Sequence, residues 1–157
     1  MKYFSIEELS RSDTAMRLGI KNVPNESERA NLVALIDNVL DVAREYFKRP
    51  IRVTSGFRNS TLNARVGGET NSQHTQGRAA DIVCYKEGLQ GNFLIGKLIA
   101  QYTDFDQLIF EDCGKNDLLP KWIHVSYKSK EANRHQILKK VKGEKVYRAL
   151  SKSRLGL

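Results

Sequence analysis

The chain has 157 residues, of which 40% are hydrophobic and 28% charged, and its formal net charge is +8. This length suits a single core, so we expect residues 1–157 to form one domain. No apolar run approaches the roughly 20 residues that a membrane-crossing helix needs, which excludes a membrane-embedded class. The positive charge favours polyanionic partners such as anionic cell-wall polymers or nucleic acid.

The first residues predict a short helix rather than a targeting segment. Ser5 is followed three positions later by Glu8, which matches a capping box at a helix start. The stretch 1–8 lacks the apolar centre of a secretion signal. We therefore expect synthesis in the cytoplasm without a signal peptide, so that another agent must release the protein if its substrate lies outside the membrane.

Two long helices are predicted from apolar residues that recur at three- and four-residue spacing. The first covers residues 26–48, after a loop at residues 22–25, and Pro50 ends it. A shorter helical turn at 60–66 is closed by Gly67-Gly68, which we interpret as a helix stop rather than a phosphate-binding loop. The second long helix covers residues 88–102.

Short alternating or apolar segments predict strands. They lie at residues 51–54, 79–85, 107–111 and 122–127, with one or two more between residues 135 and 150. The expected fold class is α+β: a small antiparallel sheet that carries the functional site, flanked by helices that come mostly from the N-terminal half.

The two cysteines, Cys84 and Cys113, do not form a CxxC pair, which excludes a cysteine zinc site. We expect reduced, partly buried thiols, and a disulfide is the open alternative. His135 lies among basic residues and is interpreted as a surface histidine.

Three residues carry most of the functional information: His74, Asp81 and His124. Two imidazoles and one carboxylate are a sufficient protein donor set for a catalytic zinc ion. The seven-residue spacing of His74 and Asp81 does not suit one helix face but suits a loop that leads into a strand. The alternatives are a solvated loop histidine, a capping aspartate and a core histidine. A buried aspartate needs a partner, however, and a metal ion would provide one.

The sequence around these residues resembles a known family. Residues 72–81 follow the pattern S-x-H-x-x-G-x-A-x-D, and residues 122–126 read W-I-H-V-S. Together with S-G-F-R at 55–58 and the strand at 105–111, they resemble the zinc D-alanyl-D-alanine carboxypeptidases. That family also contains D-alanyl-D-alanine dipeptidases and phage L-alanyl-D-glutamate endopeptidases. The similar stretch runs from residue 51 to residue 127, about half of the chain.

The resemblance implies roles for five residues. It implies His74, Asp81 and His124 as ligands of Zn²⁺, Arg58 as the group that holds the substrate carbonyl and the developing oxyanion, and Ser72 as a contact to the peptide backbone or terminus. The alternative for Arg58 is a plain surface salt bridge.

One departure concerns the general base. Better-known members have a catalytic glutamate three residues before the second histidine, where this chain has Lys121, and no acid lies between Lys121 and His124. Glu111 is the nearest candidate, because its strand should pair near that of His124; the alternative is a solvated acid at a strand end. Asp112 and Asp117 are poorer candidates, because both lie in the following loop.

The sequence therefore predicts a zinc metallopeptidase that hydrolyses peptide bonds of bacterial peptidoglycan stem peptides. Carboxypeptidase, dipeptidase and L-alanyl-D-glutamate endopeptidase types share the same ligands, and a phage or prophage lysis enzyme is expected from the missing signal peptide. We expect a monomer that binds stem peptides and anionic cell-wall polymers, with no specific nucleic acid and no membrane partner.

Two alternatives belong to other functional classes. A zinc-containing cell-wall-binding module with impaired catalysis is suggested by Lys121 at the position of the expected acid. Nucleic-acid binding would use the basic last thirty residues, but no aromatic side chains are interleaved there to stack on bases.

Overall fold

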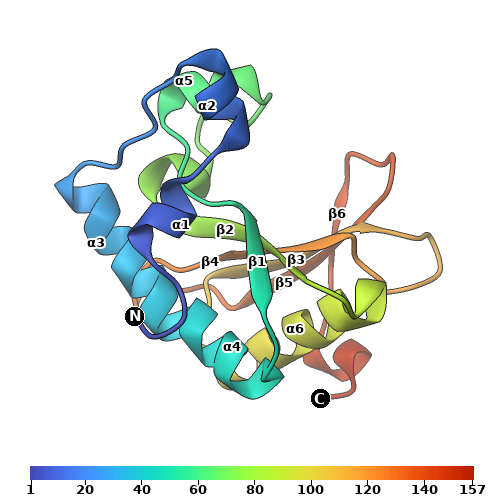
Figure 1. Cartoon of the computed structure of the whole chain (residues 1–157). Helices are drawn as coiled ribbons and strands as arrows, with labels where there is room; N and C mark the ends of the chain where they lie inside the picture. The colour runs from blue at the N-terminus through green and yellow to red at the C-terminus, as the bar shows by residue number, and fades with distance from the viewer.

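The computed structural model describes all residues 1–157 and shows one open six-stranded sheet with helices packed against it (Figure 1). The strand order is β1-β2-β4-β3-β5-β6, which confirms the expected α+β class. The strands are β1 (Ile51–Ser55), β2 (Ala79–Cys84), β3 (Gln107–Cys113), β4 (Trp122–Ser126), β5 (Gln136–Val141) and β6 (Tyr147–Ala149).

The sheet differs from the prediction at one pair, because β3 and β5 run parallel whereas the other neighbours are antiparallel. The chain reverses direction between β3 and β4 and again between β4 and β5. As a result β5 runs in the same direction as β3, and it pairs with the edge of β3 that β4 leaves open. The tail thereby extends the sheet by two strands.

The predicted helix at residues 26–48 is continuous but contains one wider turn. It consists of α3 (Glu26–Leu35), a π turn η1 (Ile36–Leu40) and α4 (Asp41–Phe47). Asn25 and Glu28 form a reciprocal capping box at its start. In the π turn the Asp41 amide donates to the Ile36 carbonyl oxygen, five residues back.

The remaining helices are short, except for α6. They are α1 (Ile6–Ser10), α2 (Asp13–Leu18), α5 (Ser60–Arg65) and α6 (Gly88–Tyr102), with single 3₁₀ turns η2 (Gln73–Gln76) and η3 (Lys152–Leu155). The sequence analysis missed α2, although Ser12 caps its N-terminus and Gly19 ends it with a φ of 67°. No helix is both long and apolar enough to span a bilayer.

The hydrophobic core lies between the helices and one face of the sheet. On that face Ile82, Phe110 and Ile123 are fully buried, and Phe93 of α6 packs against Phe110 with ring centroids 6.0 Å apart. Because side chains alternate along a strand, the intervening residues of β2, β3 and β4 project from the opposite face. The candidate site lies on that second face.

Candidate active site

The three predicted metal ligands converge on the face of the sheet that α6 leaves uncovered. Asp81 on β2 and His124 on β4 are direct cross-strand partners, so both side chains project to the same side. His74 reaches them from the turn η2. One ligand atom from each residue lies within 4.8 Å of the others. Asp81 Oδ1 is 3.0 Å from His124 Nδ1, and Asp81 Oδ2 is 3.4 Å from His74 Nε2.

A backbone carbonyl fixes the tautomer of His74. Its Nδ1 lies 2.7 Å from the Gly56 carbonyl oxygen, which accepts a hydrogen bond, so Nδ1 carries the proton and the Nε2 lone pair faces Asp81. Such an outer partner is typical of metal-ligating histidines. Burial lowers the pKa of His74, which favours the neutral imidazole that a metal ion requires.

Gly56 is needed for this contact, because its backbone packs directly on α1. A Cβ at Gly56 would lie 2.1 Å from the Leu9 carbonyl oxygen. The same close approach lets the Phe57 amide donate to that oxygen at 2.7 Å. The S-G-F-R segment therefore positions His74 through its glycine.

The Asp81 carboxylate remains ionised. Burial alone would raise its pKa, but the two adjacent histidines, His74 and His124, outweigh burial and hold the pKa below its ordinary value. Two imidazole nitrogens and one carboxylate oxygen in one cluster suit zinc chemically, and the fixed Nε2 lone pair of His74 fits a metal ion further.

Arg58 lies beside this cluster and forms no salt bridge on the surface. Its backbone amide donates to the His74 carbonyl oxygen at 3.1 Å, and its guanidinium lines the same cavity. Its Nε is buried and has no hydrogen-bond partner. No protein group accepts a hydrogen bond from the Arg58 side chain, so the guanidinium that lines the cavity is free to bind a ligand.

Glu111 lies in the cavity, whereas Lys121 does not. Glu111 is only 7% exposed, and its side chain projects from β3 opposite Trp122, on the same face as His124. Burial raises the pKa of Glu111, as a general base working near neutral pH requires. Lys121 points away and forms a 3.5 Å ion pair with Asp112. The position that supplies the acid in better-known relatives is thus outside the cavity here.

Ser72 has a local role in addition to the predicted one. Its Oγ accepts a hydrogen bond from the His74 amide at 3.3 Å and caps the turn that carries His74. Its carbonyl oxygen accepts from Thr75 Oγ1 at 2.6 Å. Ser72 also lines the cavity, and its contact to a peptide stays a prediction.

The cavity has a volume of about 840 Å³ and includes residues that the sequence analysis missed. Most come from the C-terminal tail: Gln136 and Lys140 project from alternate positions of β5, Tyr147 lies on β6, and Lys128 and Arg134 precede β5. Their signals in the sequence were the weak alternation of residues 135–150 and the basic character of the last thirty residues. The missed residues include Gln107, Lys128, Arg134, Gln136, Lys140 and Tyr147.

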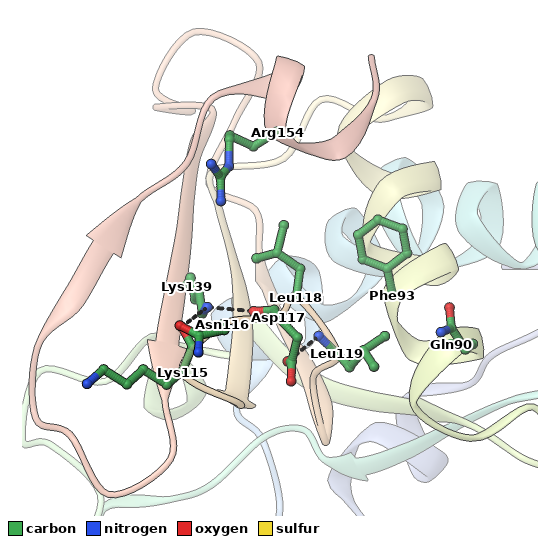
Figure 2. A pocket seen from close by; sticks show the side chains of 9 residues that line it. All are labelled: Gln90, Phe93, Lys115, Asn116, Asp117, Leu118, Leu119, Lys139 and Arg154. Atoms are coloured by element: carbon green, nitrogen blue, oxygen red, sulfur yellow. Dashed lines mark hydrogen bonds between the residues drawn. The ribbon is translucent and has the colours of Figure 1, made fainter.

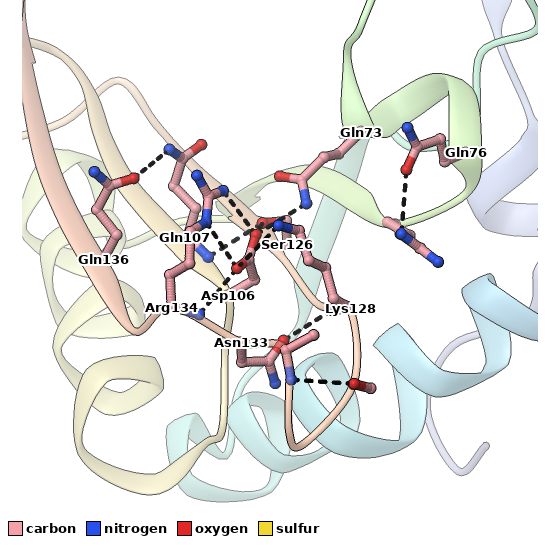
Figure 3. Close-up of polar contacts among 12 residues, drawn as sticks. Gln73, Gln76, Asp106, Gln107, Ser126, Lys128, Asn133, Arg134 and Gln136 are labelled. Carbon is pink, nitrogen blue, oxygen red and sulfur yellow. Dashed lines mark hydrogen bonds and ion pairs between the residues drawn. The ribbon is translucent and has the colours of Figure 1, made fainter.

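A fully buried carboxylate, Asp106, supports one end of this cavity (Figure 3). Its Oδ1 accepts from the Arg134 amide at 3.0 Å and from Arg134 Nε at 2.9 Å. Its Oδ2 accepts from Arg134 Nη2 at 2.8 Å and from Gln73 Nε2 at 2.9 Å. Asp106 therefore links the residue next to His74 with the start of β5.

A second cavity of about 520 Å³ lies on the other side of the sheet and contains none of the expected metal ligands or catalytic residues (Figure 2). Phe93 of α6 and Asp117 of the loop after β3 line it. Lys139 Nζ donates to the carbonyl oxygens of Lys115 and Asp117, at 3.2 and 2.5 Å, so its charge holds that loop.

The remaining candidates lie outside both cavities. Cys84 and Cys113 are free thiols, as expected. Both are buried, whereas partial burial was predicted. His135 lies at the surface, as predicted, and pairs with Asp104.

Comparison with known proteins agrees with the sequence pattern. The peptidase M15 family model matches residues 2–104. The chain is also 33% identical over 85 residues to a protein of Streptomyces albus G named zinc D-Ala-D-Ala carboxypeptidase. That alignment covers 54% of this chain and 32% of the relative, so the chain matches about a third of the relative's length. Since the family model covers well over half of the residues, the chain belongs to the peptidase M15 family.

Proposed function

We propose that this chain is a zinc metallopeptidase that hydrolyses peptide bonds in bacterial peptidoglycan stem peptides. The observation that carries the proposal is the convergence of His74, Asp81 and His124, with the free lone pair of His74 facing the other two. Family membership supports the peptidase activity, and the name of the Streptomyces relative supports both zinc and a D-Ala-D-Ala type of substrate.

The residues around the cluster have separate tasks in this proposal. Bound zinc would polarise the scissile carbonyl and lower the pKa of a water molecule that it holds. Glu111 accepts the proton of the attacking water and passes it to the leaving amine, for which its burial in the cavity suits it. Arg58 donates to the carbonyl oxygen as negative charge develops there, using the guanidinium that lines the cavity and has no protein acceptor.

The finer assignment is a D-Ala-D-Ala carboxypeptidase or an L-Ala-D-Glu endopeptidase, acting as a phage or prophage lysis enzyme on the cell wall after release. The open cavity of about 840 Å³ supports a peptide substrate in either case. A sheet that continues without interruption from β1 to β6 supports a single domain over residues 1–157. The net charge of +8 supports a monomer that also binds anionic wall polymers.

A cell-wall-binding module without catalysis is the second candidate, and Lys121 is the observation that favours it. Against it stands Glu111, a carboxylate in the cavity that could replace the missing acid. Both candidates would bind peptidoglycan, but only the peptidase would hydrolyse it.

The test is digestion of purified peptidoglycan by the zinc-loaded protein, followed by assay of newly released amines and mass analysis of the products. We expect new amino groups with the wild type and with His135→Ala, a histidine variant outside the cavity. Products that lose one D-alanine identify the carboxypeptidase type, and cleavage next to D-glutamate identifies the endopeptidase type. Zinc-loaded protein that binds the wall but releases no amine would favour the binding module.

A further inference from the structure

The cavity has two chemically different ends on either side of the metal cluster. Gln107, Ile109 and Glu111 project into it from β3, and Ile109 lies directly opposite His124. Gln107 is two residues before Ile109, so it lies about 7 Å along the strand from the position opposite His124. Glu111 lies two residues away in the other direction, so the proposed base and the Gln107 end flank the cluster.

Positive charge gathers at the Gln107 end. Arg134 and Lys128 both line the cavity there, with side chains 47% and 31% exposed. Their shared acidic neighbour is Asp106, which is 2.8 Å from Arg134 Nη2 and 3.8 Å from Lys128 Nζ. One carboxylate faces two cations, so this end keeps a net charge of about +1 toward the cavity.

Arg134 is held in place before any ligand binds. Asp106 accepts from its backbone amide, its Nε and its Nη2, which fixes the plane of the guanidinium (Figure 3). These bonds use one edge of the guanidinium and leave the two N–H groups of Nη1 without a protein acceptor. A guanidinium fixed on one edge can bind a second carboxylate without losing side-chain entropy.

We propose that Arg134, assisted by Lys128, binds a free carboxylate of the stem peptide on the amine side of the scissile bond. The inference rests on the proposed function. In D-Ala-D-Ala the amine-side residue ends in a free carboxylate, and in L-Ala-D-Glu linked through the γ-carboxyl it carries a free α-carboxylate. Both carboxylates are attached one carbon from the scissile nitrogen, so one anion-binding end serves either bond.

This assignment separates the tasks of two arginines. Arg58 adjoins the metal cluster and faces the carbonyl oxygen, whereas Arg134 lies at the Gln107 end of the cavity. The amide pair of Gln107 and Gln136, joined at 2.7 Å, adjoins Arg134 and suits the polar backbone of a bound peptide. Arg134 is a specificity residue in this proposal and takes no part in proton transfer.

The experiment compares matched peptides that differ only in that carboxylate. One pair ends in D-Ala-D-Ala as the free acid or the amide, and the other contains L-Ala-γ-D-Glu with a free or amidated α-carboxyl. For the wild type we expect amidation to lower kcat/KM by roughly 10- to 100-fold, as loss of a charge-assisted hydrogen bond implies. The pair that is cleaved identifies which of the two carboxylates is bound.

Variants then locate the effect. In Arg134→Ala the acid and the amide should be cleaved at nearly equal rates, and in Lys128→Ala the difference should shrink. Arg134→Lys keeps a cation beside Asp106 if the alanine variant does not fold, and it should also reduce the acid-to-amide ratio. Arg17→Ala, an exposed arginine on α2 away from the cavity, should keep the wild-type ratio.

The outcomes distinguish this inference from the proposed function. A wild-type acid-to-amide ratio that persists in Arg134→Ala and Arg134→Lys overturns the role of Arg134, and so does equal cleavage of acid and amide by the wild type. If no peptide is cleaved at all, the proposed function fails instead. In that case the same acid-to-amide comparison, made on dissociation constants by calorimetry with zinc-loaded protein, decides whether Arg134 binds the carboxylate.

Discussion

Residues 2–104, which match the family model, and residues 105–157, which lie beyond the match, contribute different parts of the cavity. The first region supplies His74, Asp81 and Arg58, and the second supplies His124 and the residues of the two cavity ends. The regions meet where β2 pairs with β4, so the cluster forms only when both are folded. The comparison teaches that the matched region carries two of the three expected ligands, whereas the third ligand, the proposed base and the proposed carboxylate-binding end lie beyond it.

The strongest test of that division removes one ligand from each region. Asp81→Ala and His124→Ala should each lower zinc affinity by more than about 100-fold, beyond the range typical of outer partners of a metal ligand. Both variants should lose activity to the same extent, because each removes one of three protein donors. Zinc content by mass spectrometry is the measurement, with His135→Ala as the matched control. Stoichiometric zinc in either ligand variant would contradict the site.

Replacing the proposed base, which lies in the second region, should affect zinc binding little but turnover strongly. Glu111→Gln should keep stoichiometric zinc and lower kcat by about 10²- to 10⁴-fold, the usual contribution of a general base. Lys121→Gln should leave kcat unchanged, because Lys121 pairs with Asp112 outside the cavity. Unchanged turnover in Glu111→Gln would move the base elsewhere.

Asp106 binds Gln73 of the first region and Arg134 of the second. We expect these contacts to stabilise the fold, and the free energy of unfolding to depend on pH through Asp106. Burial alone would raise its pKa, but the hydrogen bonds from Arg134 and Gln73 hold the pKa well below the ordinary value. A depressed folded-state pKa stabilises the fold above the unfolded value of about 4, and this stabilisation is lost as the pH falls below that value. We expect Asp106→Asn to cost roughly 1.5–3 kcal/mol at neutral pH, as loss of hydrogen bonds to a charged group does when its partner Arg134 is half exposed.

Chemical denaturation at several pH values measures this contribution. The difference in unfolding free energy between wild type and Asp106→Asn should be greatest near neutral pH and shrink toward pH 3. A difference that does not change with pH would mean that the Asp106 charge does not stabilise the fold.

The smallest expected effect lies wholly within the first region. Gly56→Ala would place a Cβ against the Leu9 carbonyl oxygen and force the backbone apart, at a cost of about 1–3 kcal/mol. The shift would also weaken the hydrogen bond that orients His74, so zinc affinity should fall together with the melting temperature. Gly67→Ala serves as a comparison, since its Cβ would meet no atom within 4 Å and any cost arises from its positive φ alone.

The sequence indicated local features better than long-range ones. The helix at residues 88–102 and the loop-to-strand placement of His74 and Asp81 follow from spacing within a few residues, and both were predicted correctly. The parallel pairing of β3 with β5 and the contact between Asp106 and Arg134 were not predicted. These depend on how segments 28 or more residues apart come together, and no local periodicity encodes that register.

The convergence of three chain segments on one cluster also has a thermodynamic consequence. Asp81 and His124 are 43 residues apart in the chain, so an ion that both bind would act as a cross-link between the two halves of the sheet. Binding to the native state alone adds about 2.7 kcal/mol of stability when the free ion is at 100 times its dissociation constant. Supply of the metal would then govern not only turnover but also how long the folded chain survives proteolysis.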